Sequence, residues 1–102
     1  MGIHVVNKRA FKGEGVYVGR PSVLRNPCEM KSETDRERVI RDYKVWLWER
    51  VKERSKVFAE LVWIKKLAER GDVYLICWCK PKACHGDVIA SCVEWMIREN
   101  IG

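Results

Sequence analysis

The feature that most constrains this chain is the stretch from Val73 to Ile89, which reads Val-Tyr-Leu-Ile-Cys-Trp-Cys-Lys-Pro-Lys-Ala-Cys-His-Gly-Asp-Val-Ile. Its near-continuous apolar run up to Trp78 predicts a central strand that is covered on both faces. Pro81 interrupts regular structure, and an amphipathic helix is expected to begin near Cys84. A strand, a tight loop and a helix N-terminus form an anion or nucleotide site in many α/β proteins, because backbone N–H groups converge there. The sequence therefore indicates where a site would lie.

The rest of the chain supplies further strand and helix candidates. Residues 3–6 and 16–18 have strand character, whereas residues 34–51 and 55–67 repeat apolar side chains at helical spacing. A length of 102 residues corresponds to one domain. We therefore predict a compact α/β fold, with residues 1–102 as a single domain, in which two similar strand-loop-helix motifs form a small mixed sheet packed by helices.

A weak internal repeat relates the two motifs. Gly15-Val-Tyr-Val leads through a proline-bearing loop to Cys28 and a helix, and Asp72-Val-Tyr-Leu leads through a similar loop to Cys84 and a helix. A chance match between two common units is the alternative. If the motifs are related, their loops face one another and enclose a groove with positive walls. The ligand-binding candidates in these loops are Arg20, Arg25, Asn26, Lys80, Lys82, Cys84, His85, Gly86 and Asp87.

The second loop also carries the catalytic candidates, which are Cys84, His85 and Asp87. A thiol at a helix N-terminus with basic residues nearby is expected to be more acidic than a free cysteine, which makes Cys84 the best nucleophile candidate. No distant histidine obviously completes a triad, since the only other one is His4. Asp87 is expected to cap the helix, with contact to a ribose hydroxyl or a cation as the alternative.

Cys77, Cys79, Cys84 and His85 lie close enough in sequence to be considered as a zinc set. Their spacing argues against the complete set, because Cys84 and His85 diverge on a helix and the familiar C-x-x-C pair is absent. Cys77 is better explained as a small apolar core residue, and a disulfide between Cys79 and Cys84 is a further alternative. We therefore predict no metal and no cofactor.

The formal net charge is +6, from 20 Lys and Arg against 14 Asp and Glu, which favours acidic partners such as phosphorylated ligands or acidic protein surfaces. The excess is spread along the chain without a basic arm or a recognition motif, so nucleic-acid binding is expected to be weak and non-specific at best. No apolar stretch approaches the roughly 20 residues of a membrane helix, and no signal-peptide pattern is present. We expect no membrane association and an intracellular location.

The order of these motifs resembles an uncharacterised domain family that occurs in phages, in bacteria and in viruses of archaea. The resemblance covers nearly the whole chain. It rests on Ile3-His-Val-Val-Asn-Lys-Arg, Val16-Tyr-Val-Gly-Arg-Pro-Ser, Asn26-Pro27 and Cys77-Trp-Cys-Lys-Pro-Lys-Ala-Cys-His-Gly-Asp-Val-Ile89. It implies a shared fold and a viral source, which would place the protein in the host cytoplasm, and it implies no particular chemistry.

Two functions from different classes are favoured by these patterns, and a basic nucleic-acid binder, which needs its basic residues on one face, is a third hypothesis. The first is a viral-type binding module that takes a peptide, a partner protein or a nucleotide-like ligand in the groove between the two motifs. The alternative is a small enzyme that acts on a nucleotide-derived substrate through Cys84, His85 and Asp87. An open groove with polar rims would favour binding, whereas a closed pocket around Cys84 with shifted pKa values would favour catalysis.

Overall fold

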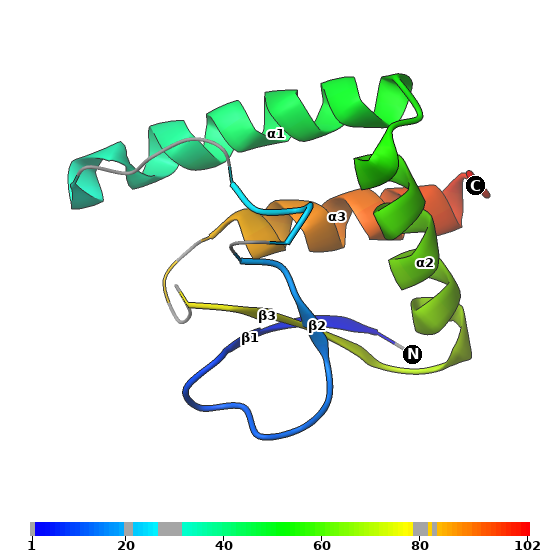
Figure 1. Ribbon diagram of the computed structural model, residues 1–102, viewed down its shortest axis with the longest axis horizontal. Coiled ribbons are helices and arrows are strands. Elements are labelled where there is room, and N and C mark those ends of the chain that lie inside the picture. Colours follow the sequence, from blue (N-terminus) through cyan, green and yellow to red (C-terminus); the bar gives the residue numbers. More distant parts are fainter. Residues whose placement is uncertain (1, 20–21, 27–31, 79–81, 83) are drawn as a thin grey trace.

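Within residues 2–19, 22–26, 32–78, 82 and 84–102, which the structure (a computed structural model) describes, three strands form a sheet and three α-helices pack on it (Figure 1). The elements in chain order are β1 (Ile3–Asn7), β2 (Val16–Tyr17), a short 3₁₀ helix η1 (Glu33–Asp35), α1 (Arg36–Lys52), α2 (Lys56–Arg70), β3 (Val73–Cys77) and α3 (His85–Arg98). The predicted single α/β domain is confirmed. No helix in these ranges is long and apolar enough to cross a lipid bilayer.

β3 is the central strand of the described sheet, whose order is β1-β3-β2. Both neighbours pair with it in parallel, and Val5 and Val16 both lie opposite Leu75. The central position confirms the prediction from the apolar run. The expected mixed pairing is corrected to a parallel one, because each connection is a crossover: residues 8–15 pass over one face, and α1 with α2 lies on the other (Figure 1).

The two faces of β3 are buried to different extents. Val73, Leu75 and Cys77 are buried beneath the helices, whereas Tyr74 and Ile76 on the opposite face are half-buried. The connection of residues 8–15 covers that second face, where Phe11 stacks on Tyr74 with 4.8 Å between ring centroids. The predicted cover on both faces is therefore present, with helices on one face and a loop on the other.

α3 lies between the sheet and α1, and α2 packs against the same helix (Figure 1). The close fit of α3 on the sheet depends on Gly86, where a Cβ atom would lie 2.8 Å from Cγ1 of Val5. The buried stripe of α1 has the predicted helical spacing and consists of Val39, Tyr43, Leu47 and Val51.

The irregular segment that follows β2 is built into the core. Val18 and Leu24 are fully buried. A turn at Ser22 redirects the chain, since the backbone N–H of Arg25 donates to the Ser22 carbonyl at 3.0 Å. The buried hydroxyl of Tyr43 on α1 donates to the Leu24 carbonyl at 2.7 Å. This bond satisfies a backbone group that has no partner in a helix or a sheet ladder.

Replacing Tyr43 with Phe is expected to lower the free energy of unfolding by about 1–3 kcal/mol, because the buried Leu24 carbonyl would lose its donor. Urea unfolding followed by circular dichroism measures the difference. Tyr74→Phe is the matched control, since the half-buried Tyr74 packs on His4 and Phe11 and its hydroxyl has no hydrogen bond to another described residue. Equal stabilities of the two variants would contradict this role for Tyr43.

Candidate functional site

β1, β2 and β3 all end at one edge of the sheet, here called the carboxyl edge, and α3 begins beside it (Figure 1). Tyr17 lies opposite Ile76, and the N–H of Val18 donates to the Ile76 carbonyl at 3.0 Å. The loops after β2 and β3 therefore start side by side, as the predicted groove requires. Some of the predicted residues lie outside the described ranges, namely Arg20, Lys80 and Cys79.

His85, the first residue of α3, is buried and ties the helix to the loop after β2. Its Nε2 lies 2.7 Å from the carbonyl oxygen of Val18, so Nε2 carries a proton and donates it. The imidazole also meets the Tyr43 ring edge to face, with 5.1 Å between centroids. Burial lowers the pKa of His85, because the charged form would lose its hydration. His85 is therefore a neutral hydrogen-bond donor. This role suits a structural contact between α3 and the loop after β2 better than it suits a general base.

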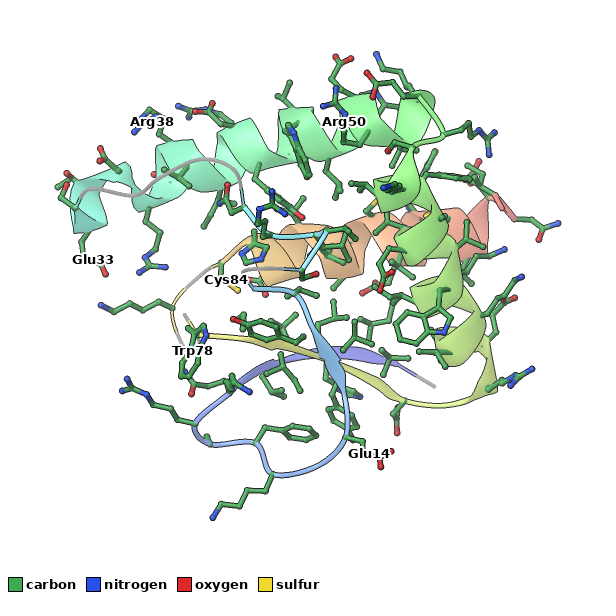
Figure 2. The ribbon with its side chains drawn as sticks, in the orientation of Figure 1. Glu14, Glu33, Arg38, Arg50, Trp78 and Cys84 are labelled. Atoms are coloured by element: carbon green, nitrogen blue, oxygen red, sulfur yellow. The ribbon has the colours of Figure 1, made fainter. Side chains whose placement is uncertain are left out.

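Cys84 lies at the start of α3 (Figure 2), where its thiol meets that of Cys77 on β3. The two Sγ atoms are 3.0 Å apart, both side chains are buried, and both residues are thiols rather than half-cystines. The hydrogen bond with Cys77 and then burial raise the pKa of Cys84. The prediction of an acidic thiol is therefore wrong, because these effects outweigh the helix N-terminus. Cys77 is a core residue, as predicted.

Asp87 closes the N-terminus of α3 from within. Its Oδ2 accepts the backbone N–H of Cys84 at 3.1 Å, and the Cys84 side chain accepts the backbone N–H of Asp87, which makes a capping box. The predicted capping role of Asp87 is confirmed. The close approach that Gly86 permits is to Val5 of β1. Backbone N–H groups that were expected to face an anion are thus partly used in the cap itself.

Lys82 joins the loop after β3 to the turn before α1. Its ammonium lies 2.9 Å from Oε1 of Glu33. Hydrogen bonds from Arg36 and then from Lys82 lower the pKa of Glu33 to about 2. The positive charge of Lys82 is therefore partly neutralised by Glu33, so Lys82 attracts an anion in the predicted groove less strongly than the sequence suggested.

Arg25 and Asn26 end the described part of the loop after β2. Arg25 is exposed and donates from Nη1 to the Ser22 carbonyl at 3.3 Å, within its own turn, while Asn26 is half-buried. Within the described ranges Arg25 has no acidic partner. Two of the positive charges expected around the groove belong to described residues, Lys82 and Arg25. Among the described residues, Lys82 is paired with a carboxylate and Arg25 is not.

The residues considered as a zinc set are not gathered into a metal site within the described part of the chain. No group of three or more His, Cys, Asp or Glu side chains there could hold a metal ion. Cys77 and Cys84 do meet, but Nε2 of His85 is directed at the Val18 carbonyl. The arrangement packs these side chains against one another and against the backbone.

Sequence reasoning missed a cluster at the same edge, which we term the aromatic–basic patch: Lys8, Arg9, Tyr17 and Trp78. Trp78 (Figure 2) is 49% exposed and donates from its indole Nε1 to the Tyr17 hydroxyl at 3.0 Å. The Lys8 ammonium lies 5.3 Å from the Tyr17 ring centroid and 5.9 Å from that of Trp78. The Arg9 guanidinium lies 5.5 Å from the Trp78 centroid. The signal in the sequence that could have revealed this patch is the position of its residues. All four lie at, or one or two residues beyond, the ends of the strands, and those strands end at one edge of the sheet.

A groove of about 510 Å³ lies elsewhere, between α1 and α3. Trp48 and Trp95 meet edge to face in its wall, with 5.2 Å between ring centroids. Its lining consists of Lys44, Leu47, Trp48, Asp87, Val88, Ser91, Cys92 and Trp95. Among the described residues that the sequence predicted for the site, Asp87 alone lines this groove. The groove and the carboxyl edge are therefore largely separate surfaces.

Comparison with known proteins places residues 3–95 in the family described as Domain of unknown function (DUF4326). The match extends from β1 into α3, and so includes all the other strands and helices described above and most of α3. No curated protein and no solved structure matches the chain.

Lowering the pH below about 6.5, the ordinary pKa of histidine, is expected to destabilise the protein more than it destabilises a His85→Gln variant. The pKa of His85 is lowered in the folded state, so the unfolded chain binds the extra proton first. Stability from this residue is therefore present above that pH and is lost as the pH falls. Urea midpoints at about pH 7.5 and pH 5.5 measure the difference. A His85→Gln variant that keeps the wild-type pH dependence would contradict the assignment.

Cys84 is expected to react with iodoacetamide much more slowly in the native protein than in urea, because its thiol is buried and its pKa is raised. Alkylation at about pH 8, with mass spectrometry of fragments to assign each cysteine, follows both states. Native labelling of Cys84 at the rate of the unfolded chain would show that the thiol is accessible and would restore it as a nucleophile candidate.

Proposed function

The chain belongs to the family described as Domain of unknown function (DUF4326), and we propose that it is a binding module that takes an anionic ligand at the carboxyl edge of its parallel sheet. The observation that carries the proposal is that β2 and β3 end side by side at this edge, where the exposed cations Lys8 and Arg9 follow β1. The ligand chemistry is that of a phosphorylated, nucleotide-like molecule or of an acidic segment of a peptide or partner protein.

Topology supports this position for the site. Ligands of open α/β sheets bind outside the carboxyl ends of parallel strands, where neighbouring loops diverge. Here the loops after β2 and β3 leave adjacent strands, and the bond from His85 to Val18 fixes the first of them against α3. A fixed base at the ends of adjacent parallel strands suits a binding module.

Charge at the edge supports an anionic ligand. Lys8 and Arg9 follow β1 directly and have no carboxylate partner among the described residues. Many other cations do pair with acids, as Lys82 pairs with Glu33. Unneutralised cations at the end of a sheet attract a negative ligand, and the overall charge of +6 adds to that attraction.

The same geometry favours binding over the catalytic alternative. The thiol of Cys84 is buried and its pKa is raised, and His85 spends its Nε2 proton on a backbone carbonyl. Asp87 caps the helix that carries both residues. A nucleophile needs an accessible thiolate and a base that is open to the substrate, so these contacts support a structural use of the Cys-His-Gly-Asp motif.

The viral source that the sequence resemblance implies remains part of this proposal. A virus-encoded module of this kind would act in the cytoplasm of the host cell.

Nuclear magnetic resonance titration of the ¹⁵N-labelled protein tests the proposed function. Adenosine triphosphate and an oligoglutamate peptide serve as anionic probes at low salt, and uncharged adenosine serves as the matched control. We expect the anionic probes to shift the amides of Lys8, Arg9, Val18 and Trp78 more than those of α2, because Lys8 and Arg9 lie at that edge without a carboxylate partner among the described residues. Shifts confined to the groove between α1 and α3, or no shifts with either anion, would contradict the proposal.

A further inference from the structure

We infer that the aromatic–basic patch binds single-stranded nucleic acid, with an unpaired base stacked on Trp78 and the adjoining phosphates held by Lys8 and Arg9. The inference deepens the proposed function and rests on it, because the patch occupies the same carboxyl edge. It names the ligand class, and it adds four residues that the motif-based reading of the loops did not include.

Trp78 is an exposed aromatic side chain that is held in place. The residue is 49% exposed, and the hydrogen bond from Nε1 to the Tyr17 hydroxyl restrains the orientation of its indole. The side-chain amide of Asn7 also donates to the Trp78 carbonyl at 3.1 Å, which anchors the backbone beneath it. A ring that is restrained before the ligand arrives loses little side-chain entropy on binding. It therefore suits a stacking platform better than a freely rotating surface tryptophan would.

The two cations of the patch are positioned by rings rather than by acids. Lys8 lies within 6 Å of two ring centroids, at 5.3 Å from Tyr17 and 5.9 Å from Trp78, and Arg9 lies 5.5 Å from Trp78. An aromatic face orients a cation without cancelling its charge. Since the described residues provide neither cation with a carboxylate, both charges remain available to a phosphate.

A base joined to phosphates matches both halves of the patch. Proteins that hold single strands without sequence preference combine cations that follow the backbone with aromatic rings on which bases stack. An acidic peptide would use Lys8 and Arg9 but would leave the exposed Trp78 ring without a matching group. A duplex would keep its bases paired within the stack, and so would offer the ring no exposed base face. The arrangement therefore favours single strands over duplexes and over acidic peptides.

Fluorescence anisotropy with a labelled oligothymidylate of roughly 12 nucleotides, at about 50 mM salt, tests this inference. Trp78→Ala is expected to weaken binding by roughly tenfold, and Trp78→Phe by less, because a smaller ring still stacks. The double variant Lys8→Ala/Arg9→Ala is expected to weaken binding and to reduce the slope of log affinity against log salt by roughly the two lost phosphate contacts.

Matched controls lie on α2. Trp63 is 48% exposed, nearly the same as Trp78, so Trp63→Ala removes an equivalent ring from another surface. Lys56→Ala/Lys66→Ala removes the same net charge as the double variant, from exposed positions on that helix. Both controls are expected to retain wild-type affinity to within about twofold. Circular dichroism melting verifies that each variant is folded, and the lysine–arginine variant carries the test if Trp78→Ala is not.

The outcomes separate the ligand class from the site. If the patch variants bind the oligonucleotide as tightly as the controls do, the inference is overturned. If an oligoglutamate peptide shifts the edge in magnetic resonance and the oligonucleotide does not bind, nucleic acid is the wrong class while the proposed function stands. If no anion binds at the edge, both fail. Thymidine monophosphate that binds as tightly as the oligonucleotide would identify a free nucleotide, rather than a strand, as the source of the same chemistry.

Discussion

The structure depends on two buried side chains that donate hydrogen bonds to the irregular segment after β2. Tyr43 on α1 donates to the Leu24 carbonyl, and His85 on α3 donates to the Val18 carbonyl. Buried backbone carbonyls must find donors, and a segment outside any ladder depends on side chains to provide them. The same bonds connect α1, α3 and the end of β2 at one point, with the Tyr43 and His85 rings in contact. The hydrogen bonds of Tyr43 and His85 in the core therefore fix the geometry of the carboxyl edge.

Much of the fold could be predicted because the spacing of apolar residues along the chain indicates each helix and strand. The stripe through Tyr43 and Leu47 and the apolar run of β3 need only neighbouring residues to be recognised. The direction of strand pairing is not local, since it depends on how residues 8–15 cross the sheet. Nor is the aromatic–basic patch, because Lys8 and Trp78 meet only through a register that places Asn7 opposite Cys77. Sequence patterns locate elements well, but they do not bring together residues that lie on different strands.

The chemistry of the Cys-His-Gly-Asp motif was harder to predict, because opposite effects act on the same atoms. A helix N-terminus lowers the pKa of a thiol, whereas burial raises it. Which effect wins depends on the direction of the side chain, and Cys84 points to Cys77, 3.0 Å away between sulfur atoms. For Asp87 the capping role was predictable, since its position three residues after Cys84 is that of a capping box. The motif joins α3 to β3 through Cys84 and to the segment after β2 through His85, which explains why these two reactive side chains are buried.

If the carboxyl edge binds an anion as proposed, the capping of α3 by its own residues determines which groups would hold that anion. Part of the hydrogen-bonding capacity of the α3 backbone is committed to Cys84 and Asp87, so charged side chains must supply more of the attraction. Fixed backbone donors select a ligand shape, whereas exposed lysine and arginine attract phosphate with little regard for sequence and are screened by salt. An exposed ring adds stacking, which every base can provide. Binding at this edge would therefore be sensitive to salt and tolerant of sequence. The net positive charge, which is spread along the chain, would attract the ligand, and the aromatic–basic patch would determine where it binds.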